Sequence, residues 1–186
     1  EYYELAAKQN NSTALVILGN IYSDGLGVAN NYEKAREYYE LAAKQNDSKS
    51  FLNLGYLYYY GLGVAKDFLK AKDCYEKSAQ LGNSTAILNL GYLYSNGNGV
   101  KIDYLKSKQY FESLAEKNDP NGLYELGELY FNGEGIEKNY KKAFEYYRKS
   151  SKLGNSYAMF RLAFCYGLGE GIEQNYKKAI VCYQKA

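Results

Sequence analysis

One stretch decides the fold: residues 83–94 read Asn-Ser-Thr-Ala-Ile-Leu-Asn-Leu-Gly-Tyr-Leu-Tyr and lead into a glycine-rich turn. Ala86, Leu90 and Leu93 recur at helical spacing, so this stretch predicts an amphipathic helix. Beyond the turn, residues 104–115 show the same spacing and predict a second helix. The structural unit is therefore a pair of helices joined by a turn.

The same unit recurs along the chain at intervals of 36 residues. Its clearest sign is a Gly-x-Gly pair after each first helix. The pairs begin at Gly25, Gly61, Gly97, Gly133 and Gly169. Such a period is typical of repeat arrays, in which each unit is too small to bury its own apolar face and stacks on its neighbours. The sequence therefore predicts an all-α array of 36-residue helix-turn-helix repeats.

Cap residues predict where the helices begin and end. Pro120 suits the first turn of a helix, which makes Asp119 the expected N-cap. The equivalent residues are Asn11, Asp47, Asn83 and Asn155. The second helices are expected to begin after Asn31, Asp67, Asp103, Asn139 and Asn175. Left-handed C-caps are expected at Asn46, Gly82, Asn118 and Gly154, because Gly and Asn adopt that conformation most easily.

These caps predict one solenoid over residues 1–186. Its repeats are expected at residues 11–46, 47–82, 83–118, 119–154 and 155–186, the last being incomplete. Residues 1–10 are identical to residues 37–46, so they are expected to form the second helix of a truncated repeat. We therefore expect the chain to be a piece of a longer array.

Small residues at fixed places predict how the two helices of a repeat meet. The middle of the first helix carries Gly19, Gly55, Gly91, Gly127 and Ala163. Glycine there costs about 1 kcal/mol relative to alanine, so close approach of the second helix is expected to compensate. The expected contacts are the small residues Ala35, Ala71, Ser107, Ala143 and Ala179, with Tyr39, Tyr75, Phe111, Tyr147 and Tyr183 filling the groove beside them.

The repeat motif resembles the Sel1-like repeat, a relative of the tetratricopeptide repeat. Residues 54–58, 61–64 and 67–71 carry it as Leu-Gly-Tyr-Leu-Tyr, Gly-Leu-Gly-Val and Asp-Phe-Leu-Lys-Ala, and the match covers essentially the whole chain. The resemblance implies a right-handed α/α solenoid that serves as a non-enzymatic scaffold or adaptor for protein–protein interaction. Cysteine-rich secreted members carry paired cysteines in each repeat. Here Cys74, Cys165 and Cys182 occupy apolar positions instead.

The composition argues against catalysis within this chain. It contains no histidine, the commonest general base and metal ligand, and no Cys-x-x-Cys spacing suited to zinc. The Gly-x-Gly pairs follow helices rather than strands, so they predict turns and not nucleotide-binding loops. We expect no enzymatic activity, no metal and no cofactor. The missing disulfide framework favours an intracellular location.

The charge distribution argues against nucleic-acid binding, and the hydropathy argues against membrane insertion. The net charge is +2, and glutamates are interspersed among the lysines of the second helices. The column Lys34, Lys70, Lys106, Lys142 and Lys178 is therefore expected to be a solvated helix face. No apolar run approaches the roughly 18 residues that suggest a membrane span.

The resemblance implies that first helices line a concave face, where two variable columns would contact a partner protein or peptide. The predicted contact residues are Asn53, Tyr56, Asn89, Tyr92, Glu125, Glu128, Arg161 and Phe164, in columns that begin at Ile17 and Asn20. Asn53 and Asn89 are expected to pair with the backbone of an extended peptide. The tyrosines would add contact area, and the two glutamates would favour a basic residue. The competing interpretation is that these are ordinary polar residues of a helix surface.

Two other functions fit the same sequence. The array could be structural, associating end to end through its open repeats. It could also be the targeting arm of an enzyme whose catalytic domain lies outside this chain.

Overall fold

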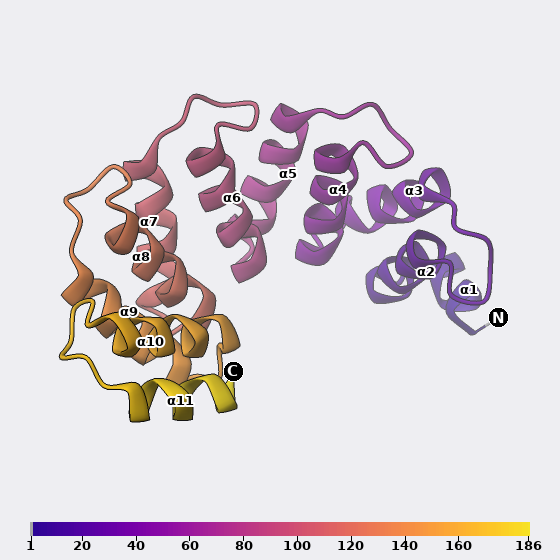
Figure 1. The fold of residues 1–186 in the computed structure, drawn as a ribbon. Coiled ribbons are helices and arrows are strands. Elements are labelled where there is room, and N and C mark those ends of the chain that lie inside the picture. Colours follow the sequence, from indigo (N-terminus) through magenta and orange to yellow (C-terminus); the bar gives the residue numbers. More distant parts are fainter. Residues whose placement is uncertain (1) are drawn as a thin grey trace. The chain divides into compact units, whose positions relative to one another are not determined.

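The computed structural model describes residues 2–186, and over these residues the chain forms eleven α-helices and no strand (Figure 1). Glu1, which was predicted to belong to the first helical fragment, lies outside the described residues. That fragment contains α1 (Tyr2–Lys8). The first helices of the repeats are α2 (Ser12–Asp24), α4 (Ser48–Tyr60), α6 (Ser84–Asn96), α8 (Pro120–Asn132) and α10 (Ser156–Leu168). The second helices are α3 (Tyr32–Ala43), α5 (Phe68–Gln80), α7 (Tyr104–Ala115), α9 (Tyr140–Lys152) and α11 (Tyr176–Lys185).

The chain divides into two compact units. Unit 1 extends to Leu93 and includes Asn98–Val100, whereas unit 2 contains Tyr94–Gly97 and Lys101–Ala186. In unit 1, α3 packs against both α2 and α4; in unit 2, α9 packs against both α8 and α10. In both units a second helix therefore contacts its own first helix and that of the next repeat, and the apolar core lies between them. No helix within residues 2–186 has both the length and the apolar character needed to cross a membrane.

The predicted caps are confirmed. Asp119 accepts hydrogen bonds from the backbone N–H groups of Asn121 and Gly122 at 2.9 and 3.1 Å, with Pro120 in the first turn. The same kind of bond is made by Asn11, Asp47, Asn83, Asn155, Asn31, Asp67, Asp103, Asn139 and Asn175. The predicted C-cap residues Asn46, Gly82, Asn118 and Gly154 all have positive φ, between 55° and 90°. Cap chemistry is local, which is why these ends can be read from the sequence.

The two glycines of a Gly-x-Gly pair have different roles in the pairs that begin at Gly61, Gly97, Gly133 and Gly169. Gly133 ends α8 at φ 75° and donates its backbone N–H to the carbonyl of Leu129 at 2.9 Å. Gly135, at φ 67°, lies against Tyr104 of the preceding repeat, whose Cβ a side chain on Gly135 would overlap. Three equivalent contacts join Gly63 to Tyr32, Gly99 to Phe68 and Gly171 to Tyr140. In these four pairs the first glycine ends a helix and the second makes a close contact between repeats, whereas a Cβ on Gly27 would have no neighbouring atom within 4 Å.

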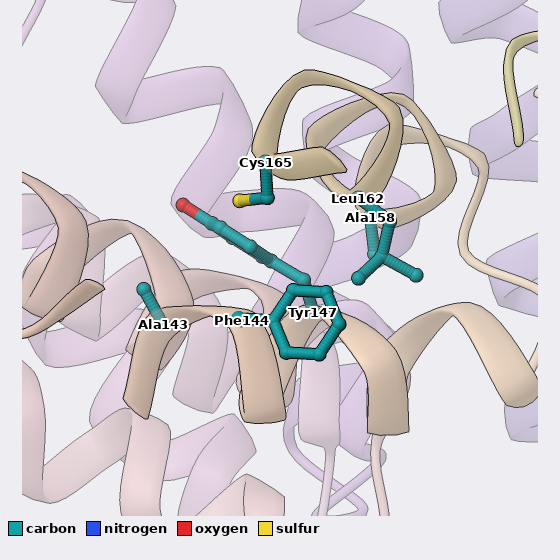
Figure 2. Packing of buried hydrophobic residues seen from close by; sticks show 6 residues of the cluster. All are labelled: Ala143, Phe144, Tyr147, Ala158, Leu162 and Cys165. Atoms are coloured by element: carbon teal, nitrogen blue, oxygen red, sulfur yellow. The ribbon is translucent and has the colours of Figure 1, made fainter. Parts of the chain in front are cut away.

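The mid-helix glycines make room for tyrosine rings. A Cβ built on Gly127 would lie within 2.6 Å of Cδ1 of Tyr147, and Gly19 with Tyr39 and Gly55 with Tyr75 show the same crowding. Tyr147 is buried among Ala143, Phe144, Ala158, Leu162 and Cys165 (Figure 2). The predicted close approach of the two helices is confirmed in these three repeats. The atoms nearest to the glycine belong to the aromatic ring, however, and not to the small residue of the second helix.

The lysine column contacts tyrosines, although the sequence predicted only a solvated helix face. The Nζ of Lys106 lies 4.3 Å from the ring centroid of Tyr94, and that ring stacks on Tyr110 at 5.9 Å. The equivalent pairs are Lys34–Tyr22, Lys70–Tyr58, Lys142–Tyr130 and Lys178–Tyr166. Each lysine thus lies over the face of a ring, where the ring quadrupole attracts its charge. Each lysine of the column therefore joins the second helix of its repeat to the first helix of the same repeat.

Candidate peptide-binding surface

The predicted contact residues fall into two groups, one in each unit. Unit 1 holds Asn53 and Tyr56 on α4 with Asn89 and Tyr92 on α6; unit 2 holds Glu125 and Glu128 on α8 with Arg161 and Phe164 on α10. Members of each pair are three residues apart, so they share a helix face. The structure therefore presents two separate candidate surfaces.

Unit 1 contains a groove with a volume of about 490 Å³. Its walls come from α2, α4 and the first turn of α6, with Tyr39 of α3 between them. The lining includes Asn20 and Asn53 as amides and Asp24 and Lys49 as charges. Apolar surface is added by Val16, Leu52, Leu57 and Leu62. The lining therefore mixes polar and apolar side chains, and polar groups placed among apolar surface fix the orientation of a ligand.

A hydrogen-bond network holds the amide of Asn53. Its Nδ2 donates to Oδ1 of Asn20 at 3.0 Å, and the hydroxyl of Tyr39 donates to the same oxygen at 2.8 Å. A carboxamide has two N–H groups and a carbonyl oxygen, so the contacts of Asn53 with Asn20 and Tyr39 do not use its full hydrogen-bonding capacity. The network fixes the amide in one orientation within the groove.

Burial raises the pKa of Tyr39 to about 12, although hydrogen bonds with Ser23 and Asn53 act in the opposite direction. Burial also raises the pKa of Tyr75 and of Tyr147 above the ordinary value for tyrosine. In each case the folded state favours the neutral phenol. All three side chains are at most 2% exposed.

These raised pKa values predict loss of stability at alkaline pH. The unfolded chain ionises its tyrosines near pH 10.0, while the buried phenols resist ionisation. The stabilisation that each buried neutral phenol provides is therefore complete below pH 10.0. It is lost as the pH rises through the folded-state pKa, at about 1.4 kcal/mol per pH unit for each tyrosine. Thermal unfolding followed by circular dichroism from pH 8 to pH 12, in about half-unit steps, would measure this loss. Tyr75→Phe should reduce the slope, whereas Tyr157→Phe, at a 71% exposed position, should not; a melting temperature that stays level above pH 10.0 would contradict the prediction.

Asn89 differs from Asn53 because its Nδ2 is buried and has no hydrogen-bond partner among the described residues. It lines a second, smaller cavity of about 70 Å³. The other lining residues are Tyr56, Tyr59, Tyr60, Tyr75 and Tyr92. The two asparagines that were predicted to act as equivalent clamps therefore differ in hydrogen bonding: Nδ2 of Asn53 is paired and Nδ2 of Asn89 is not.

Glu128 and Arg161 pair with each other in unit 2. Nε of Arg161 lies 2.6 Å from Oε1 of Glu128, and its Nη2 also contacts Oε2, so the pair is bidentate. The hydroxyl of Tyr147 donates to Oε1 of Glu128 at 2.6 Å, and the guanidinium lies 5.2 Å from the ring centroid of Phe131. Burial by itself would lower the pKa of Arg161, but the hydrogen bonds and charge of Glu128 raise it. The carboxylate of Glu128, which was predicted to be an acidic contact for a partner, is therefore paired with a positive charge within the chain.

Residues of the two columns contact side chains of the preceding repeat. Asn53 pairs with Asn20 and Arg161 with Glu128, in each case a residue 33 positions earlier. The rings of Phe164 and Phe131 meet edge to face at 6.1 Å with the same separation. Complementary residues 33 positions apart are the sequence signal for these contacts. Comparing positions 36 residues apart does not reveal it, because that comparison aligns equivalent residues and not residues in contact.

The thiols are poor candidates for nucleophiles. Cys74, Cys165 and Cys182 are free. Burial raises the pKa of Cys74 to about 11 and that of Cys165 to about 12, so both are protonated at neutral pH. Within residues 2–186 no three or more Cys, Asp or Glu side chains are placed to hold a metal ion.

Helix pairs that stack with a 36-residue period define an α/α solenoid protein. The family model for the Sel1 repeat matches residues 1–11, 12–47, 52–83, 84–119, 120–155 and 156–186. The chain therefore belongs to the Sel1 repeat family. Proteins of this family generally serve as protein-interaction scaffolds and are typically not catalytic.

Solved structures of similar proteins agree with this assignment. A Sel1 repeat protein from Oxalobacter formigenes is 32% identical, with a TM-score of 0.88 over 95% of this chain and 72% of that protein. The protective antigen c5321 from uropathogenic Escherichia coli is 29% identical, with a TM-score of 0.67 over 99% of this chain and 47% of that protein. The immunity protein Pa5087 from Pseudomonas aeruginosa shares the fold at 24% identity, with a TM-score of 0.67 over 98% of this chain and 70% of that protein. A search of the curated proteins finds no match.

Proposed function

We propose that this chain is a non-enzymatic interaction module that binds an extended peptide of a partner protein in the groove of unit 1. The observation that carries the proposal is the 490 Å³ groove along α2, α4 and the start of α6, with the amide of Asn53 oriented inside it. An oriented amide lowers the cost of binding because its rotamer is already selected.

The chemistry of the lining suits a peptide backbone. An extended peptide presents N–H and C=O groups that a carboxamide can pair with, whatever the side chains are. The apolar walls would bury side chains on alternate residues of the peptide. Asp24 and Lys49 offer one charge of each sign, so the partner is expected to be mixed in charge.

The proposal assigns different roles to the two groups of predicted contact residues. Asn53, Tyr56, Asn89 and Tyr92 contact the partner in unit 1. Glu128 and Arg161 join α8 to α10 in unit 2. The partner is thus recognised by amides and aromatic rings rather than by an acidic patch.

A peptide library displayed on phage and selected on the immobilised chain tests this function. We expect enriched peptides whose affinity falls at least about fivefold in Asn53→Ala, since one hydrogen bond contributes roughly 1 kcal/mol. Lys141→Ala, an exposed change in unit 2, serves as the control and should bind as the wild type does. Failure to enrich any peptide, or equal binding by both variants, would refute the groove as the binding site.

A further inference from the structure

A small pocket in unit 1, the tyrosine pocket, is lined by Tyr56, Tyr59, Tyr60, Tyr75, Asn89 and Tyr92. Tyr59 and Tyr60 meet edge to face at 4.8 Å, and Tyr56 stacks with Tyr60 at 6.5 Å. The amide of Asn98 donates a 2.7 Å hydrogen bond to the hydroxyl of Tyr59. These contacts hold the rings in a fixed arrangement. One water needs about 10–15 Å³, so a pocket of about 70 Å³ admits a group of several heavy atoms.

Asn89, one of the lining residues, carries a hydrogen-bond donor without an acceptor. Nδ2 of Asn89 is buried and unpaired, and such groups are rare in folded proteins. In the preceding repeat, Asn53 donates to Asn20, 33 residues earlier. The residue 33 positions before Asn89 is Tyr56, so a tyrosine stands where the accepting carboxamide would be.

Charge decides which chemical group this pocket can accept. No residue of the lining carries a charge, so a bound carboxylate would have no counterion. Tyrosine faces attract cations, but the unpaired N–H of Asn89, a residue of the lining, carries partial positive charge that disfavours a cation beside it. A ligand with a neutral carbonyl oxygen next to a compact apolar ring suits this lining. The oxygen would accept a hydrogen bond from Asn89, and the ring would pack on the tyrosine faces.

Proline in an extended peptide supplies this combination. Its ring packs on aromatic faces, and a polyproline II segment has no internal hydrogen bonds, so its carbonyl groups are available as acceptors. The pocket also adjoins the proposed groove, because Tyr56 lines both. Tyr60, which is 59% exposed, forms the outer rim.

We propose that the tyrosine pocket binds a proline of the partner peptide and that Asn89 donates its free N–H to a neighbouring peptide carbonyl. This inference rests on the proposed function and specifies the class of peptide, a proline-containing extended segment.

Fluorescence anisotropy with a labelled decaproline peptide, and with a Gly-Ser peptide of equal length as its control, tests the proposal. We expect decaproline to bind at least about tenfold more tightly than the Gly-Ser peptide. Asn89→Leu should weaken decaproline binding at least about fivefold, as expected when one hydrogen bond is lost. The same variant should melt at an equal or higher temperature, because it removes an unpaired donor and not a bond. Asn96→Leu, at an exposed position at the end of α6, is the matched control and should change neither value.

The side-chain amide signals of Asn89 in an NMR spectrum give a second readout. They are identified by their absence in Asn89→Leu and should move on addition of decaproline. Equal binding of decaproline by the wild type and Asn89→Leu would overturn the proposal. So would a peptide with trimethyllysine that binds the wild type in preference to decaproline.

The two proposals fail in different ways. If decaproline does not bind, but proline-free library peptides do and lose affinity in Asn53→Ala, the proline assignment is wrong and the groove function stands. If neither decaproline nor any library peptide binds, both proposals are wrong.

Discussion

Replacing Gly127 with leucine is expected to lower the free energy of unfolding by about 3 kcal/mol or more, the upper end of the usual cost of overpacking. A Cβ at this place would already stand within 3 Å of two ring carbons of Tyr147. That ring cannot move away easily, because it is fully buried and its hydroxyl is bonded to Glu128. Urea denaturation followed by circular dichroism measures the change.

Two alanine variants separate packing from helix propensity. Gly167 also lies inside a helix, but a Cβ at this position would have no neighbouring atom within 4 Å, so Gly167→Ala should stabilise by up to about 1 kcal/mol. Gly127→Ala should destabilise, although alanine is the better helix former. If both substitutions stabilise equally, the ring of Tyr147 does not require a glycine beside it. The fifth repeat carries Ala163 at this position, and the equivalent Tyr183 is 46% exposed.

Replacing Glu128 with alanine is expected to destabilise the protein by about 2–3 kcal/mol, below the full cost of breaking a buried ion pair because both side chains keep some exposure. The exposed fractions are 17% for Glu128 and 27% for Arg161. The substitution leaves the Arg161 guanidinium and the hydroxyl of Tyr147 without their acceptor. Urea denaturation of the wild type and the variant gives the difference.

A surface ion pair provides the control for this prediction. Lys108 and Glu112 are 2.6 Å apart on one helix, where Glu112 is 41% exposed. Glu112→Ala should cost less than about 1 kcal/mol, as exposed pairs usually do. A double-mutant cycle with Arg161→Met isolates the coupling between Glu128 and Arg161. Equal costs for the two glutamate substitutions would show that burial adds nothing to the pair in unit 2.

The structure places the predicted contact residues in two different environments. Asn53 and Tyr56 do line a groove, because residues three apart on a helix share a face whatever the rest of the fold does. Glu128 was predicted to contact a partner, and the structure pairs its carboxylate with Arg161, whose position depends on how α10 packs on α9. The lysine column likewise contacts tyrosines that no local pattern connects to it.

The sequence by itself determined the helices, their caps, the turns and the repeat family. Each of these depends on residues a few positions apart or on a period that is visible by counting. Only the tertiary structure decided which polar side chains satisfy one another and which do not. The bond of Asn53 to Asn20 and the unpaired amide of Asn89 arise from the same position in successive repeats. They differ because hydrogen bonding depends on distances of a few ångströms between helices of different repeats, and these distances are set by packing.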